Sequence, residues 1–133
     1  MSDDAIPTTP GAIAWADITV PDADRLRDFY RDVAGWTPSA LSMGDYADYV
    51  MHDASGAAVA GVCHARGPNA DMPPQWLVYV TVPDADAAAA RCVELGGRVV
   101  AGPRPMGGGR CAVIEDPAGA VIALFAAPTG AEG

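Results

Sequence analysis

The residues best suited to acid–base chemistry are a carboxylate and a phenol at equivalent places in an internal repeat. Residues 18–24 read I-T-V-P-D-A-D and residues 80–86 read V-T-V-P-D-A-D, an offset of 80 − 18 = 62 residues. At this offset Asp17 is equivalent to Tyr79, and Thr19 to Thr81. Because a buried carboxylate is costly unless it is paired, Asp17 is a candidate general base or ligand anchor, and Tyr79 a candidate hydrogen-bond donor. The alternative is that Asp17 bonds to neighbouring strands and that the threonines satisfy the sheet interior.

A strand followed by a helix must position the first of these groups. By the two-residue period of a strand, residues 13–20 place Trp15, Asp17 and Thr19 on one face. After Asp22, a plausible helix cap, apolar residues at i, i+3, i+4 and i+7 predict a helix that ends at Gly35. The face of the strand that lacks Asp17 should pack on this helix.

The remaining segments repeat that pattern. Module one is expected to continue with a weak strand at 37–43 and strands at 46–52 and 57–63, the last two joined by the turn D-A-S-G. After a linker at 66–74, module two is expected to hold strands at 76–82, 98–101, 110–115 and 121–126 and a helix at 84–95. The glycine-rich stretch 102–109, with Met106 as its apolar anchor, is a candidate lid over a site. The fold class is therefore α+β, two tandem βαβββ modules.

The length of 133 residues predicts one domain at 12–127, in which module one spans about 12–66 and module two about 75–127. Residues 1–11 and 128–133 are expected to be tails. No apolar run approaches the roughly 18 residues that span a bilayer, and the acidic N-terminus lacks a signal stretch. A cytoplasmic protein is therefore expected.

The charge pattern excludes several functions. The net charge is −9 and all eight cations are arginine, so no lysine is present for Schiff-base or lysine-base chemistry. Without an arginine stripe, nucleic acid and anionic membranes are not expected as partners. Cys63, Cys92 and Cys111 form no C-x-x-C pair, so we expect buried thiols rather than a zinc site or disulfide framework.

The V-P-D-A-D after each first strand, the F-Y-R-D-V-A-G-W at 29–36 and the E-D-P-A-G-A-V-I-A-L-F at 115–125 resemble the glyoxalase/bleomycin-resistance/dioxygenase superfamily, also called vicinal oxygen chelate proteins. The resemblance covers about residues 11–127. It is strongest to the bacterial branch related to lactoylglutathione lyase. It implies that the two modules enclose a cleft on the sheet face turned away from the helices, with Asp17 and Tyr79 facing each other across it. It also implies a homodimer.

Metal-using members of this family hold a divalent ion through four positions, and the resemblance implies where each falls. They stand five residues before the Val of each V-P-D stretch and four residues after each turn glycine, at Trp15, Leu77, Ala60 and Ala123. None of these side chains offers the oxygen or imidazole ligand that such a metal requires. We therefore expect no cofactor. Were a divalent metal held in an atypical way, Asp17 and His64 would be the donors to test first.

Further residues are candidates for ligand binding in the predicted cleft. His64 lies four residues beyond Ala60 and is expected on the same face, although a lone histidine there is more often a strand-end surface residue. An aromatic lining is expected from Trp15, Trp76, Tyr46, Tyr49 and Phe125, of which some would instead fill the interface between modules. Arg110 could clamp an anionic ligand, or be solvated. Leu77, Thr19, Thr81 and Met106 complete the predicted ligand-binding set.

Three functions follow from this pattern. The first is metal-free binding of a small organic molecule in an apolar cleft, as in bleomycin-resistance proteins. The second is a lyase, isomerase or dioxygenase-like enzyme that uses Asp17 and Tyr79 as acid and base, with or without an atypical metal. The third is a non-catalytic interaction module whose cleft is filled by its own side chains.

Overall fold

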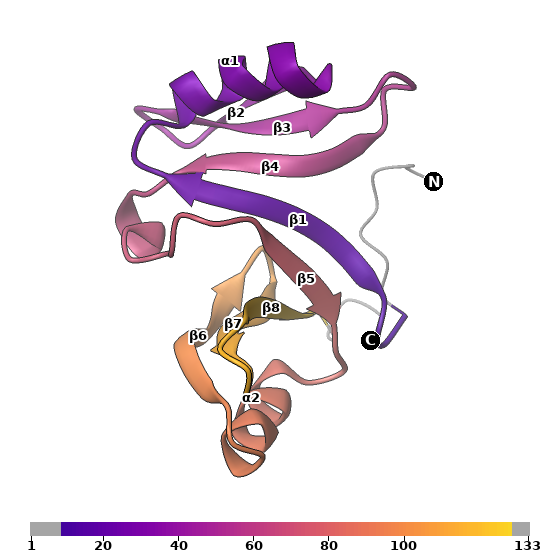
Figure 1. Cartoon of the computed structure of the whole chain (residues 1–133), viewed down its shortest axis with the longest axis vertical. Helices are drawn as coiled ribbons and strands as arrows, with labels where there is room; N and C mark the ends of the chain where they lie inside the picture. The colour runs from indigo at the N-terminus through magenta and orange to yellow at the C-terminus, as the bar shows by residue number, and fades with distance from the viewer. Residues whose placement is uncertain (1–8, 129–133) are drawn as a thin grey trace. The chain divides into compact units, whose positions relative to one another are not determined.

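A computed structural model describes residues 9–128 and shows an α+β chain of two compact units (Figure 1). One unit comprises residues 16–76, and the other comprises residues 77–128 together with residues 9–15. Each unit contains one helix and a four-stranded sheet, so the predicted α+β class and the two βαβββ modules are confirmed. The predicted cleft depends on how the two modules are placed, and it stays a prediction.

The first module is built from β1 (Ile13–Val20), α1 (Ala23–Ala34), β2 (Thr37–Ser42), β3 (Ala47–His52) and β4 (Ala58–His64), followed by a short 3-10 turn, η1 (Gly67–Asn69). Its strands run in the order β2-β3-β4-β1, with β1 and β4 parallel. The Asp22 carboxylate accepts a hydrogen bond from the Arg25 amide (3.1 Å) and so begins α1, as predicted. Gly35 ends the helix in a left-handed conformation that a side chain would strain.

The core of the first module lies between α1 and the sheet. Ile18, Val62 and Met51 are buried there, and Leu26 and Tyr30 of α1 pack against them. Two residues of the apolar stripe of this helix stay largely uncovered, because Phe29 is 52 % exposed and Val33 66 % exposed. The helix therefore carries uncovered apolar surface.

The second module is built from β5 (Leu77–Thr81), α2 (Ala85–Glu94), β6 (Arg98–Met106), β7 (Gly109–Glu115) and β8 (Val121–Ala126), in the strand order β5-β8-β7-β6. Its alanine-rich helix buries Ala85 and Ala89. At the start of the described chain, the Gly11 amide donates to the Thr81 carbonyl and the Thr81 amide to the Ala12 carbonyl. The last residue of the predicted N-terminal tail is thus paired, and residues 1–8 and 129–133 lie outside the described residues.

The glycine-rich stretch is not a lid. It forms the end of β6 and the turn into β7, in which Arg104 pairs with Cys111 and Met106 with Gly109 after a register shift between Ala101 and Arg104. Gly107 and Gly108 both have positive φ, as the tight two-residue turn between paired strands requires. The prediction was wrong because these glycines serve the turn chemistry of a hairpin. Within residues 9–128 neither helix has the length and apolar composition to span a membrane.

Candidate functional site

The sheet face of module one opposite α1, called the open face here, carries a buried polar group. Strand register pairs Asp17 with Gly61 and Thr19 with Cys63, so these residues share a face, whereas the Ile18 and Val62 pair points into the core under α1. Asp48 also belongs to the open face, because the next residue, Tyr49, pairs with Val62. The expected face of Asp17 and Thr19 is therefore confirmed.

Three polar side chains of the open face are almost fully buried: Asp17 is 7 % exposed, Thr19 5 % and Asp48 6 %. The Asp48 carboxylate accepts a hydrogen bond from the His64 backbone amide (2.8 Å). Burial, followed by the negative charges of Asp17 and Asp48, raises the pKa of the Cys63 thiol far above its ordinary value. Cys63 is thus a protonated, unreactive thiol beside two carboxylates. The prediction of buried thiols is confirmed for Cys111, whereas Cys63 and Cys92 are only half-buried.

The equivalent face of module two is less polar. Tyr79 pairs with Ala123 and Thr81 with Phe125, so these four share one face of the parallel β5–β8 pair. Leu77, Tyr79, Thr81 and Phe125 are all buried. Tyr79 and Asp17 belong to different units, and their predicted approach across a cleft stays a prediction.

A β-bulge in module one moves the position that the family would use for a metal ligand. In β4, His52 pairs with Ala58 but Met51 pairs with Ala60, so Val59 is an extra residue in the strand. The β7–β8 hairpin has no such shift. Ala60 therefore lies in the core under α1, and Gly61 takes the open-face place beside Asp17. The expectation that Ala60 faces the cleft is wrong for this reason.

Neither residue could bind a metal in any case. Gly61 has no side chain, and Ala123, Leu77 and Trp15 at the other family positions offer no ligand atom. Within residues 9–128 no three His, Cys, Asp or Glu side chains are grouped so as to hold an ion. The residues present therefore do not fit the divalent metal of the family.

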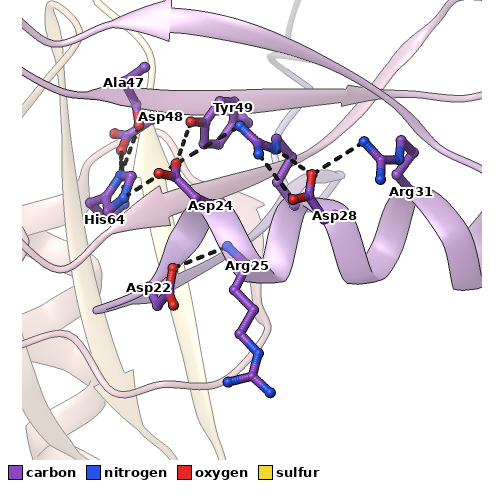
Figure 2. Close-up of polar contacts among 10 residues, drawn as sticks. Asp22, Asp24, Arg25, Asp28, Arg31, Ala47, Asp48, Tyr49 and His64 are labelled. Atoms are coloured by element: carbon purple, nitrogen blue, oxygen red, sulfur yellow. Dashed lines mark hydrogen bonds and ion pairs between the residues drawn. The ribbon is translucent and has the colours of Figure 1, made fainter.

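Two predicted cleft residues lie on the helix side of the sheet instead. Tyr49 donates a short hydrogen bond to the Asp24 carboxylate in the first turn of α1, and His64 Nε2 lies 3.7 Å from the same carboxylate (Figure 2). The prediction placed His64 on the face of Ala60, which is correct, but that face is covered by α1. Tyr49 and His64 thus connect β3 and β4 to α1, and their contact with a ligand stays a prediction.

Hydrogen bonding fixes the orientation of the His64 ring. Nδ1 lies 2.8 Å from the Ala47 carbonyl, which can only accept, so Nδ1 carries a proton. The same nitrogen lies 3.6 Å from the Asp48 carboxylate. The His64 side chain, which is 12 % exposed, therefore lies between Asp48 of the open face and Asp24 of the helix.

The two other aromatic residues of module one also differ from the prediction. Trp76 packs on the α1 side, where its indole Nε1 donates to the Tyr30 hydroxyl (3.0 Å). Tyr46 packs edge-on against His64, with the Arg66 guanidinium over its ring at 4.3 Å. Trp76 therefore packs against the core beneath α1 and Tyr46 packs against His64, a placement that was not predicted from the sequence.

Arg110 is exposed and forms a two-bond ion pair with Asp86 of α2 (2.8 and 3.0 Å). The hydrogen bond to Arg110 lowers the pKa of Asp86. An anionic ligand would have to displace this pair. Met106 is half-buried at the end of β6, so neither residue sits on a mobile loop.

Sequence reasoning missed Asp48 and Asp24. Asp48 could have been found from the alternation A-D-Y-V-M-H, since the residue between Ala47 and Tyr49 must face away from α1. Asp24 looked like one more acidic residue in the first turn of a helix. Its role depends on Tyr49 and His64 reaching it from strands 25 and 40 residues later, which no local pattern reports.

Comparison with known proteins is consistent with this architecture. Residues 12–124 match the model of the Glyoxalase/Bleomycin resistance protein/Dioxygenase superfamily. The anthracycline biosynthesis protein DnrV of Streptomyces peucetius is 37 % identical over 129 residues, covering 87 % of this chain and 47 % of that protein. A putative glyoxylase, CFP32 of Mycobacterium tuberculosis, is 34 % identical over 116 residues, covering 86 % and 44 %. This chain thus spans about half the length of these curated relatives.

A solved structure shows the same fold. Methylmalonyl-CoA epimerase from Mycobacterium tuberculosis aligns with a TM-score of 0.58 and 18 % identity, over 98 % of this chain and 97 % of that chain. At this identity the likeness shows the fold alone. From the family model and the curated relatives together, the chain belongs to the Glyoxalase/Bleomycin resistance protein/Dioxygenase superfamily.

Proposed function

We propose that this chain binds a small organic molecule against the open face of module one, without the divalent metal of the family. One observation carries the proposal. Asp17, Thr19 and Asp48 are buried together on a face whose metal positions hold Gly61 and Trp15, which offer no ligand atoms. A few polar groups on an otherwise apolar surface are what an organic ligand needs for orientation.

The relatives suggest which ligands to test first. DnrV and DauV of Streptomyces are named as anthracycline biosynthesis proteins. A planar polycyclic aromatic compound is therefore a sensible first probe for this chain. The candidate binding groups are Asp17 and Thr19 in module one. On the equivalent face of module two they are the apolar residues Leu77, Ala123 and Phe125 with the polar groups of Tyr79 and Thr81. A homodimer and a cytoplasmic location belong to the same proposal.

The decisive experiment titrates the protein with an anthracycline, daunorubicin, and with bleomycin by calorimetry. Replacing Asp17 with Asn should weaken the productive ligand about tenfold, because a hydrogen bond to a charged group contributes roughly 1.5–3 kcal/mol. Asp71→Asn is the matched control, since it removes the same charge from an exposed turn. EDTA should leave the affinity unchanged. Equal loss in both variants, or an affinity that EDTA abolishes, contradicts the proposal.

The burial of both Asp17 and Tyr79 favours a second candidate, acid–base catalysis. A carboxylate and a phenol at equivalent positions of the repeat could abstract and return a proton at an activated carbon. Any turnover, tested first on the hemithioacetal of methylglyoxal and glutathione, should then disappear in Asp17→Asn and in Tyr79→Phe, while ligand affinity in Tyr79→Phe changes little. Turnover that survives in both variants excludes this chemistry.

A further inference from the structure

An apolar groove runs beside the first two turns of α1, on the side of the module-one sheet opposite Asp17. It has a volume of about 400 Å³ and is lined by Val20, Pro21, Asp22, Arg25, Leu26 and Phe29. This volume falls in the range of small-molecule sites, roughly 300–1,000 Å³. Four of its six lining residues are apolar, so it offers a hydrocarbon surface with two charged groups.

Phe29 supplies the most exposed apolar surface of the groove. Its ring is 52 % exposed and packs edge-on against Tyr30, with the ring centres 5.0 Å apart. Leu26, one turn earlier, packs partly into the core and so fixes the floor of the groove. An aromatic ring left half in water beside a concave apolar surface marks a place where another molecule can remove it from water.

Arg25 is the cation of this groove, and its guanidinium has no side-chain partner within residues 9–128. The other arginines of the chain are all engaged. Arg27, Arg31, Arg66, Arg91, Arg98 and Arg110 each form an ion pair with a carboxylate, and Arg104 has an interaction of its own. Among the arginines within residues 9–128, one beside an apolar groove with no carboxylate partner in that part of the chain is the exception.

The neighbouring carboxylate of Asp22 forms no ion pair with the Arg25 guanidinium. Asp22 lines the same groove, but its Oδ1 accepts the hydrogen bond of the Arg25 backbone amide that caps α1. Figure 2 shows the Arg25 side chain extending away from the Asp24, Tyr49 and His64 contacts, with no interaction at its guanidinium. The guanidinium is therefore available to form two parallel hydrogen bonds with an incoming carboxylate.

We propose that this groove binds a small organic acid with an apolar body. The carboxylate would pair with Arg25, and the hydrocarbon or aromatic body would cover Leu26 and Phe29. The site lies on the α1 side of the sheet and shares no residue with the open face, so it is separate from the ligand site proposed above. Because Arg25 is exposed, the ion pair contributes modestly, and the affinity depends on both parts of the ligand.

The test uses 2-naphthoate as the probe and the neutral 2-naphthalenemethanol as its matched analogue. Binding of each compound is measured by ¹H–¹⁵N NMR of the full chain. In the wild type, naphthoate should shift the amides of residues 20–29 in a saturable way. Arg25→Gln should weaken naphthoate at least about fivefold and the neutral analogue less than about twofold. Arg31→Gln, on the same helix but outside the groove, is the matched control and should change neither.

Phe29→Ser should weaken both probes, whereas Val33→Ser, at an exposed apolar position of α1 outside the groove, should not. The dispersion of each spectrum reports whether the variant is folded. The inference fails if the shifts map elsewhere or do not saturate, or if Arg25→Gln behaves like Arg31→Gln. It also fails if Asp17→Asn weakens naphthoate, because the probe would then occupy the open face, a result that leaves the proposed function standing.

Discussion

The two modules begin their helices with the same residues but use them differently. Asp22 and Asp84 occupy equivalent places and both cap their helix, and Asp24 and Asp86 follow at equivalent places in the first turns. Asp24 receives Tyr49 and His64 from β3 and β4, whereas Asp86 pairs with exposed Arg110 of β7. Identical helix starts thus serve a half-buried network in module one and a solvated ion pair in module two.

This difference teaches that duplication preserved the local helix signal while the partners diverged. A capping carboxylate is determined by residues within one turn, and both copies keep it. The partner of the next carboxylate comes from a distant strand and depends on strand register. Module one carries polar groups on both faces of its sheet, whereas the helix of module two buries alanines and its strands bury mainly apolar and aromatic side chains. If either module carries chemistry, the contrast points to module one.

The largest effect is expected at one of two glycines that occupy equivalent positions in the sequence repeat. Gly97 stands at the place of Gly35 by the offset of 62, yet a Cβ at Gly97 would lie 2.5 Å from Cys92 Sγ and 2.7 Å from the Glu115 carbonyl. Gly97→Ala should therefore lower the free energy of unfolding by about 3 kcal/mol. Gly35 has open space and φ of 75°, so Gly35→Ala should lower it by about 1 kcal/mol. Urea denaturation measures both.

Adding Cys92→Ala to Gly97→Ala should recover part of the lost stability, since it removes the sulfur contact and leaves the carbonyl contact. Gly96, with φ of 99°, is the true counterpart of Gly35 at the end of a helix, and Gly96→Ala should resemble Gly35→Ala. Equal losses at Gly35 and Gly97 would show that the two glycines are equivalent after all.

The second prediction compares the two first-turn carboxylates. Asp24→Asn should destabilise the protein by about 1 kcal/mol, because it weakens the hydrogen bond that the buried Tyr49 phenol donates to this carboxylate. Asp86→Asn should cost much less, since exposed ion pairs contribute little. The control within this pair is the matched charge change at equivalent positions. A larger loss at Asp86 would overturn the contrast between the modules.

A spectroscopic readout accompanies this pair. The hydrogen bond to Asp24, with burial, raises the pKa of Tyr49 above its ordinary value of about 10. A phenol whose pKa is raised by folding adds stability that is present below the unfolded pKa and lost as pH rises through the folded one. Asp24→Asn should bring the late-titrating phenol back toward pH 10 in an absorbance titration. Asp86→Asn should leave it unchanged.

The repeat predicted the fold well because strands and helices are encoded locally. Turn residues, alternation and caps gave the strands and both helices, and the offset of 62 correctly placed Asp17 and Tyr79 on strands β1 and β5. Counting residues from the turn glycine gave the wrong face where a β-bulge inserts one extra residue that no sequence motif marks. The bulge at Val59 shifted Ala60 off the open face, and the earlier end of α2 made Gly96, rather than Gly97, the left-handed glycine.

The candidate site was harder to predict, because it depends on which face of the sheet each side chain takes. That face is set by strand pairing and is not marked by a local sequence motif. His64 and Tyr49 looked like cleft residues until the register of β3 and β4 placed them under α1. Arg25 could not be singled out from eight arginines, since its lack of a partner is a property of the folded chain. Local sequence propensity predicts whether a residue lies in a strand or a helix, but the pairing between strands determines which face of the sheet its side chain takes.

The smallest effect is expected at the two equivalent hairpin turns, which differ by one side-chain hydroxyl. In module one Asp53 accepts from the Ser55 hydroxyl (2.6 Å), the Ser55 amide and the Ala57 amide, and the hydroxyl is the first cause of the lowered pKa of Asp53. In module two Ala118 stands in place of Ser55, so Asp116 accepts only from the amides of Ala118 and Ala120. Ser55→Ala therefore converts one turn into the other.

Because the folded pKa of Asp53 is depressed, the turn adds stability above the unfolded value near 3.9 that is lost as pH falls through the folded pKa. Ser55→Ala should raise the pKa of Asp53, so this loss begins at a higher pH, whereas Ser42→Ala, a hydroxyl that contacts Gly44 instead, should not. Carbon-13 NMR titration of the aspartate carboxyls separates the two. An unchanged Asp53 titration in Ser55→Ala would mean that the backbone amides alone hold this charge, and that the two turns are electrostatically the same.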